Sequence, residues 1–183
     1  AGVEFARHAA EVATPIRGDD YGRLEGFWMT EIGRLHQVMH LWSFESFDER
    51  HRLRTELFQN PAWVNEYVPL VRPYLVRQDV RLMHEIKPIV RPDTTGNIYE
   101  FRHYRLKPGC VGQWAKLFMK YLPAREEYSQ VTGVFHTEAE QPNEVCHLWV
   151  YPDLNTRLEA RDAAAADPRW PSLRQGRSRR YCG

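Results

Sequence analysis

The sequence contains an internal repeat, and this feature restricts the fold more than any other. Residues 26–64 align without a gap with residues 133–171 at an offset of 107 positions, and eleven of the 39 aligned pairs are identical. Unrelated segments of this length would share about two or three. Two homologous modules therefore follow one another. The identical pairs are Gly26/Gly133, Thr30/Thr137, Glu31/Glu138, Val38/Val145, His40/His147, Leu41/Leu148, Trp42/Trp149, Arg50/Arg157, Arg54/Arg161, Pro61/Pro168 and Trp63/Trp170.

Hydrophobic periodicity assigns the elements of each module. Aromatic and β-branched residues predict strands in residues 97–106, 131–139 and 144–151, and helical spacing predicts helices in residues 111–129 and 154–166. The first module continues with a helix in residues 62–76 and a strand in residues 77–88. The order β-α-β-β-α-β predicts an α+β fold with two tandem ferredoxin-like modules.

The module boundaries follow from the repeat and from a stretch rich in proline and polar residues. We expect a first module in residues 1–90, a linker in residues 91–97 and a second module in residues 98–183. The first module lacks its opening strand and the second its closing strand. A sheet with a missing strand has unpaired backbone groups at an edge, so we expect another chain, or a segment outside the given sequence, to fill the gap. If another chain fills it, the protein is a homo-oligomer.

Composition and charge exclude several classes of protein. A formal net charge of +1 gives no reason to expect a nucleic-acid partner, and no apolar run is long enough to cross a membrane. Three cysteines far apart, without CxxC spacing, indicate neither a structural zinc site nor a disulfide framework. We therefore expect a protein of a reducing compartment, the cytoplasm, with no metal and no cofactor.

Several separated motifs resemble those of the NIPSNAP family, a branch of the dimeric α+β barrel superfamily. They are "IYEFRHYRLKPG", "GVFHTE", "EVCHLWVY" and "DPRWPSL", and the first half repeats them as "GFWMTEIGRLHQVMHLWSFESFDERHRLR" and "NPAW". The resemblance implies that the two modules pack sheet against sheet as an α+β barrel with an internal cavity. If the protein comes from a eukaryote, a location in the mitochondrial matrix is also expected. The resemblance implies little about activity, because a fold does not determine a reaction.

The hairpin of residues 131–151 contains the strongest candidates for a site. If "EQPN" is a four-residue loop, Ala139 faces Glu144 and His136 lies opposite His147. Cys146, Leu148 and Val150 form the more apolar face, which we expect beneath the helices. The other face would then line the barrel, together with one side of strand 97–106. The residues predicted to point inward are Glu100, Arg102, Tyr104, His136, Glu138, His147 and Trp149.

Three chemical interpretations compete for these side chains. Two histidines and a carboxylate could hold a metal, but the first module has Met29 where the second has His136, which disfavours a repeated metal site. A histidine that titrates near neutral pH could act as a general acid or base without a cofactor, beside Arg102 and Tyr104. Alternatively, His40 and His147 could support the tryptophans Trp42 and Trp149 within the fold.

The sequence favours His136, Arg102 and Tyr104 as catalytic residues, since His136 occurs in one module alone. The remaining candidates bind the ligand: Glu100, Glu138, His147, Trp149, His40 and Trp42. We expect a protein that binds a small aromatic or polyketide-like organic molecule in the barrel, with or without converting it. The alternative is a non-catalytic interaction or scaffold protein. The helical pairs Arg50/Arg54 and Arg157/Arg161 are interpreted as solvated, salt-bridged faces.

Overall fold

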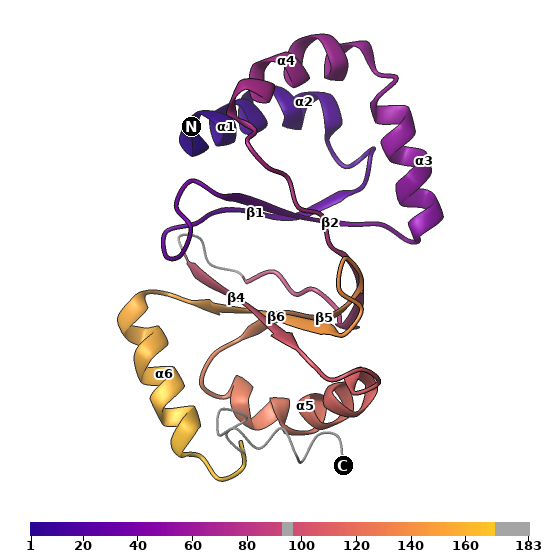
Figure 1. Cartoon of the computed structure of the whole chain (residues 1–183). Helices are drawn as coiled ribbons and strands as arrows, with labels where there is room; N and C mark the ends of the chain where they lie inside the picture. Colours follow the sequence, from indigo (N-terminus) through magenta and orange to yellow (C-terminus); the bar gives the residue numbers. More distant parts are fainter. Residues whose placement is uncertain (93–96, 171–183) are drawn as a thin grey trace. The chain divides into compact units, whose positions relative to one another are not determined.

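The computed structural model describes residues 1–92 and 97–170 (Figure 1). These residues form two compact units, of which unit 1 comprises Ala1–Asp79 and unit 2 begins at Val80. Each unit combines helices with an antiparallel sheet, so the fold is α+β, as predicted. The division falls inside residues 77–88, which the sequence predicts as a strand of the first module, and the strand observed there, Leu82–Lys87, belongs to unit 2.

Unit 1 consists of a bent helix, a hairpin and a second helical segment. Its elements are α1 (Gly2–His8), the π-helical turn η1 (Ala9–Ala13), α2 (Thr14–Arg17), β1 (Arg23–Met29), β2 (Val38–Ser43), α3 (Phe47–Leu57), the π-helical turn η2 (Trp63–Tyr67), α4 (Val68–Val71) and the 3-10 turn η3 (Arg72–Tyr74). The side chain of Ser46 caps α3 by accepting a hydrogen bond from the Glu49 N–H at 3.0 Å. The core joins the two helical segments through Ala13, Leu57, Trp63, Tyr67 and Val71.

Unit 2 contains a four-stranded sheet with the order β3-β5-β6-β4. Its elements are β3 (Leu82–Lys87), β4 (Ile98–Arg105), α5 (Val111–Glu126), β5 (Val131–Ala139), β6 (Glu144–Tyr151) and α6 (Leu154–Ala166). All of the pairings are antiparallel. The predicted strands and helices of the second module are thus confirmed. Strand β3 completes this sheet at the outer edge of β5.

The helices cover one face of the unit 2 sheet, and it is the face that the sequence predicts to line a barrel. Trp114, Phe118 and Leu122 of α5 form one core with residues of the sheet that include Val145 and Trp149. The predicted orientation is therefore wrong: His147 and Trp149 lie beneath the helices, whereas Cys146 points to the opposite face. Every residue of β6 is buried, so the alternation of apolar and polar residues could not distinguish its two faces.

The predicted register of the hairpin is also wrong, by two residues. His136 lies opposite Val145, and His147 lies opposite Val134. The loop is longer than four residues, because continuing this register sets Thr137 opposite Glu144, and a bulge near Thr132 shifts the pairing once more. A shift of two residues preserves the alternation of side chains. His136 and His147 therefore still lie on the same face, as predicted, but not opposite each other.

Candidate functional site

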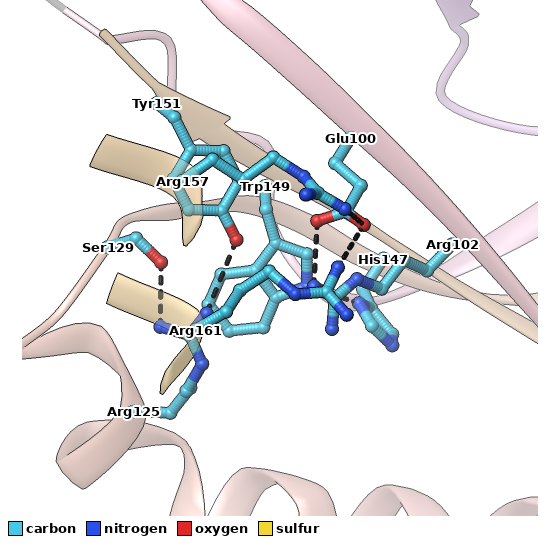
Figure 2. Close-up of polar contacts among 9 residues, drawn as sticks. All are labelled: Glu100, Arg102, Arg125, Ser129, His147, Trp149, Tyr151, Arg157 and Arg161. Carbon is cyan, nitrogen blue, oxygen red and sulfur yellow. Dashed lines mark hydrogen bonds and ion pairs between the residues drawn. The ribbon is translucent and has the colours of Figure 1, made fainter. Parts of the chain in front are cut away.

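A cluster of charged and aromatic side chains surrounds Trp149 in unit 2, and we call it the Trp149 cluster (Figure 2). Strands β4 and β6 supply its floor, and helices α5 and α6 add arginines from the covering layer. Its members are Glu100, Arg102, Arg125, His147, Trp149, Tyr151, Arg157 and Arg161.

Glu100 is the carboxylate on which three of the arginines converge. It accepts hydrogen bonds from Arg102 Nη2 at 2.7 Å and from Arg157 Nη2 at 2.6 Å, and it also accepts one from Arg161 Nη1. Partial burial opposes the ionisation of Glu100. The hydrogen bonds from Arg102 and Arg157 outweigh it and hold the pKa of Glu100 below its usual range. Glu100 is therefore a permanent anion inside a ring of cations.

Arg125 of α5 is the fourth guanidinium, and it is almost completely buried. Its Cζ lies 4.4 Å from the centre of the Trp149 ring, in a cation–π contact. It donates hydrogen bonds to Ser129 Oγ at 2.7 Å and to Tyr151 Oη at 3.3 Å. Both acceptors are neutral, and burial lowers the pKa of Arg125. The cluster thus has one carboxylate for four guanidinium groups.

His147 lies between the sheet and α5 and stacks against Phe118, with ring centres 5.0 Å apart. Its Nδ1 accepts a hydrogen bond from Trp149 Nε1, so the neutral ring carries its proton on Nε2. Burial, together with the charge of Arg102, lowers the pKa of His147 to about 3. At neutral pH the ring is therefore an uncharged hydrogen-bond donor, and it is a poor general acid.

Two buried donors of the cluster have no hydrogen-bond partner within the described part of the chain. They are Nε of Arg102 and Nε2 of His147. The two residues are direct cross-strand partners on β4 and β6, and their side chains share the face beneath the helices. An unpaired buried donor costs about 1–3 kcal/mol, so an additional acceptor here would stabilise the protein.

Tyr104 follows Arg102 on the same face of β4. Its ring centre lies 5.3 Å from that of His147, and 43% of its surface is exposed. Trp149, in contrast, is completely buried and cannot provide an open aromatic wall. The exposed aromatic surface beside the cluster is therefore that of Tyr104.

The structure places His136 outside the Trp149 cluster. Its ring stacks on His84 of β3, with ring centres 5.0 Å apart. His136 and Tyr104 both lie opposite Val145, one on each side of β6, so their backbones are about 10 Å apart at two strand spacings. Burial, followed by the charge of His84, lowers the pKa of His136. Oε2 of Glu138, on the same strand, lies 3.4 Å from Nε2 of His84, in an exposed contact that is an ion pair when His84 is protonated.

His40 and Trp42 belong to unit 1, on strand β2. Trp42 Nε1 donates a hydrogen bond to His40 Nδ1 at 3.0 Å, the same contact that joins Trp149 to His147. A guanidinium also covers the tryptophan in each unit. Arg17 Cζ lies 3.3 Å from the centre of the Trp42 ring, and Arg125 covers Trp149 in unit 2. The aligned pairs therefore have the same local structure, as the repeat predicts.

Sequence reasoning missed the role of the helical arginines. The spacing of Arg157 and Arg161 predicts a solvated face, but 29% and 15% of their side chains are exposed and both bind Glu100. Of the interpretation as a solvated, salt-bridged face, the solvated part is wrong for this pair and the salt-bridged part is confirmed. A useful signal was available, since both arginines recur in the repeat and Glu100 precedes Arg102 by two positions on a predicted strand. Arg125 and Tyr151 carried no such signal.

Among residues 1–92 and 97–170, histidine, cysteine and acidic side chains do not gather in groups of three or more that could hold a metal ion. Within the same ranges, each helix is too short or too polar to cross a bilayer.

Comparison with known proteins gives one consistent family. The sequence profile of NIPSNAP matches residues 3–87 and, separately, residues 99–179. The chain is 30% identical over 151 residues to the protein NipSnap homolog of Dictyostelium discoideum, covering 79% of this chain and 64% of that protein. It is 31% identical over 154 residues to NipSnap homolog 2 of Mus musculus, covering 82% of this chain and 54% of that protein. The chain thus spans about half to two thirds of the length of these relatives.

One solved structure with sequence similarity is an uncharacterized NIPSNAP domain protein from Burkholderia xenovorans. It is 30% identical, with a TM-score of 0.38, and the match covers 39% of this chain and 72% of that one. A NIPSNAP family protein of unknown function from Agrobacterium tumefaciens is 34% identical, with the same TM-score and coverage of 39% and 67%. With the family profile matching both halves, the chain belongs to the NIPSNAP family.

Proposed function

We propose that this protein binds a small anionic organic molecule at the Trp149 cluster. The observation that carries the proposal is the imbalance of four guanidinium groups around one carboxylate, with Arg102 Nε and His147 Nε2 left as buried donors. A carboxylate or phosphate oxygen accepts hydrogen bonds without offering a donor, so it complements both groups. The exposed ring of Tyr104 favours a ligand with a planar aromatic part.

The cluster supports binding more directly than it supports conversion. Four arginines can hold an anion, whereas His147 lacks a pKa suited to proton transfer. Cofactor-free conversion is the second candidate function, and the stacked pair of His84 and His136 favours it. Burial, followed by the positive charge of His84, lowers the pKa of His136 and so favours the uncharged form that a general base requires. A ligand that reaches from Arg102 to His136 would have to span two strands.

The larger assembly is part of the same proposal. The repeat and the matching His–Trp–Arg contacts support two ferredoxin-like modules that pack sheet against sheet as an α+β barrel. The two-stranded sheet of unit 1 supports association into a homo-oligomer, because open strand edges favour pairing. Light scattering over a wide concentration range tests the second point, and a persistent monomer would contradict it.

Calorimetric titration with benzoate and with inorganic phosphate tests the binding function. We expect saturable binding of benzoate to the wild type and a loss of at least about tenfold in affinity in Arg102→Gln, since a charge-assisted hydrogen bond contributes about 1.5–3 kcal/mol. Arg105→Gln is the matched control, because Arg105 is an exposed arginine of the same strand whose side chain points to the other face. Equal losses in both variants, or no binding of either probe, would support the scaffold interpretation instead.

A further inference from the structure

The unit 2 sheet carries a second polar group on the face opposite the helices, centred on Glu144 at the start of β6. Glu144 and Cys146 share this face, because alternate residues of a strand point the same way. The side chain of Glu144 is only 5% exposed, and its Oε1 accepts a hydrogen bond from Arg81 Nε at 2.8 Å. The same oxygen lies 3.3 Å from His103 Nδ1. A buried carboxylate thus links a guanidinium to an imidazole.

This carboxylate determines the tautomer of His103. An ionised carboxylate accepts hydrogen bonds and cannot donate one, so Nδ1 of the neutral ring carries the proton and Nε2 has the lone pair. Burial, followed by the charge of Arg81, lowers the pKa of His103, and the charge of Glu144 opposes this effect. At neutral pH the ring is therefore an uncharged base. It has the reverse of the tautomer of His147, whose Nδ1 is the acceptor.

His103 is also accessible, unlike His147. Its side chain is 29% exposed, and its ring stacks on Phe101 with ring centres 5.0 Å apart. The side chain of Arg81 is 38% exposed. Since His103 and Arg81 contact the same oxygen of Glu144, a small molecule that contacts the imidazole also lies near the guanidinium.

One further group on this face lacks a partner. Thr137 lies opposite Glu144 in the hairpin and is 1% exposed, and its hydroxyl has no hydrogen-bond partner in the described part of the chain. In unit 1 the aligned Thr30 donates a hydrogen bond to the Gln37 carbonyl oxygen at 3.3 Å. Gln37 is the counterpart of Glu144, so unit 1 has an amide where unit 2 has the carboxylate. An oxygen atom of a ligand in unit 2 would satisfy the Thr137 hydroxyl.

The remaining side chains of this face indicate what kind of ligand it suits. Phe135, Leu148 and Val150 are apolar and buried, so they favour an uncharged ligand. The stacked rings of Phe101 and His103 favour a planar one. A small planar carbonyl compound has both properties and provides an oxygen that can accept hydrogen bonds.

We propose that His103 is a general base that removes a proton from the carbon next to the carbonyl group of a small, uncharged, planar compound. The C–H bond breaks, the proton moves to His103 Nε2, and the electron pair moves to the carbonyl oxygen, which becomes an enolate. Arg81 stabilises the enolate oxygen, and Glu144 is a positioning residue that fixes the ring. Delivery of the proton to this oxygen completes a keto–enol isomerisation, which needs no other reactant. The site is separate from the Trp149 cluster and does not depend on anion binding there.

The probe for this activity is 5-nitrobenzisoxazole, an uncharged planar compound. A general base removes its C–H proton while the N–O bond breaks, and the electron pair moves to the oxygen of a coloured nitrophenolate that is measured by absorbance. We expect the full chain to open the probe at least about tenfold faster than imidazole at the same concentration, and His103→Gln to lose at least about tenfold of this rate. His51→Gln is the matched control and should retain the wild-type rate, because His51 is an exposed histidine of α3.

The pH dependence of this rate tests the roles of Arg81 and Glu144. The charged groups that face His103 are Arg81, Glu144 and Arg105 of its own strand, whereas Cys146 stays protonated because burial raises its pKa to about 12. The rate should rise as the pH passes the pKa of His103, because only the neutral ring accepts a proton. Glu144→Gln removes a negative charge, so this rise should move to lower pH. Arg81→Gln removes a positive charge, so the rise should move to higher pH.

Proton NMR titration of the His103 ring measures the same pKa without turnover, and circular dichroism checks the folding of each variant. The proposal is wrong if the wild type is no faster than imidazole, or if His103→Gln retains the wild-type rate. Shifts of the pKa in the same direction in Glu144→Gln and Arg81→Gln would also overturn it, since a merely structural role does not give opposite shifts. So would a loss of rate in His136→Gln in place of His103→Gln, because the base would then belong to the pair of His84 and His136.

Discussion

The buried histidine His147 makes the stability of unit 2 depend on pH in a direction that can be calculated. Its pKa is lowered from 6.5 to about 3 by burial and by the charge of Arg102. Below about pH 6.5 the unfolded chain takes up a proton that the folded state does not accept. The stability that neutral His147 contributes is therefore fully present above about pH 6.5 and is lost as the pH falls toward 3.

The size of this effect follows from the pKa difference. One unit of pKa corresponds to about 1.4 kcal/mol, so the free energy of unfolding should fall by about 2 kcal/mol between pH 7 and pH 5 from His147 alone. His147→Gln is the reference, because glutamine does not titrate but retains an oxygen that can accept from Trp149 Nε1. The difference between wild type and variant removes the contributions of the other histidines.

Native-state hydrogen exchange of the β6 amides measures the stability of unit 2 itself. The measured rates are corrected for the effect of pH on the intrinsic exchange rate of an unprotected amide. We expect the wild type to lose about 2 kcal/mol more than His147→Gln between pH 7 and pH 5. If both proteins lose the same amount, His147 accepts a proton in the folded state. The argument that it acts only as a neutral donor in the Trp149 cluster would then fail.

Three further predictions concern single side chains. His136→Ala should change the free energy of unfolding by no more than about 0.5 kcal/mol, because His136 is half-exposed; a large drop in melting temperature would show a structural role. Glu100→Gln should destabilise unit 2 by about 3 kcal/mol, because it leaves four guanidinium groups without a counter-ion. Sulfate should raise the melting temperature of this variant more than that of the wild type, because the anion can bind these guanidinium groups. Cys146, whose pKa burial raises to about 12, should resist iodoacetamide in the folded protein at pH 8, and labelling of the native protein detected by peptide mapping would contradict its burial.

The sequence alone was sufficient to predict the elements of unit 2. The strands Val131–Ala139 and Glu144–Tyr151 and the helix Leu154–Ala166 begin and end where the sequence predicts. These elements are determined locally, by turn residues, by β-branched and aromatic runs and by the side chain of Asp153, which caps α6. The repeat likewise predicted that Trp42 and Trp149 have equivalent surroundings. The grouping of Glu100, Arg102 and Tyr104 with His147 and Trp149 on one face followed from strand alternation.

The tertiary structure decided the direction of the sheet face that carries His147 and Trp149, and which elements cover it. Both faces of β6 are buried, so the sequence offered no contrast by which to assign one of them to the helices. Long-range packing also brings Arg125, Arg157 and Arg161 to Glu100 and Trp149 from helices that are separate in the sequence. The register of the hairpin followed from a loop longer than four residues, and it changes again at a bulge near Thr132. Local chemistry therefore specified the elements, and the contacts between them specified the candidate site.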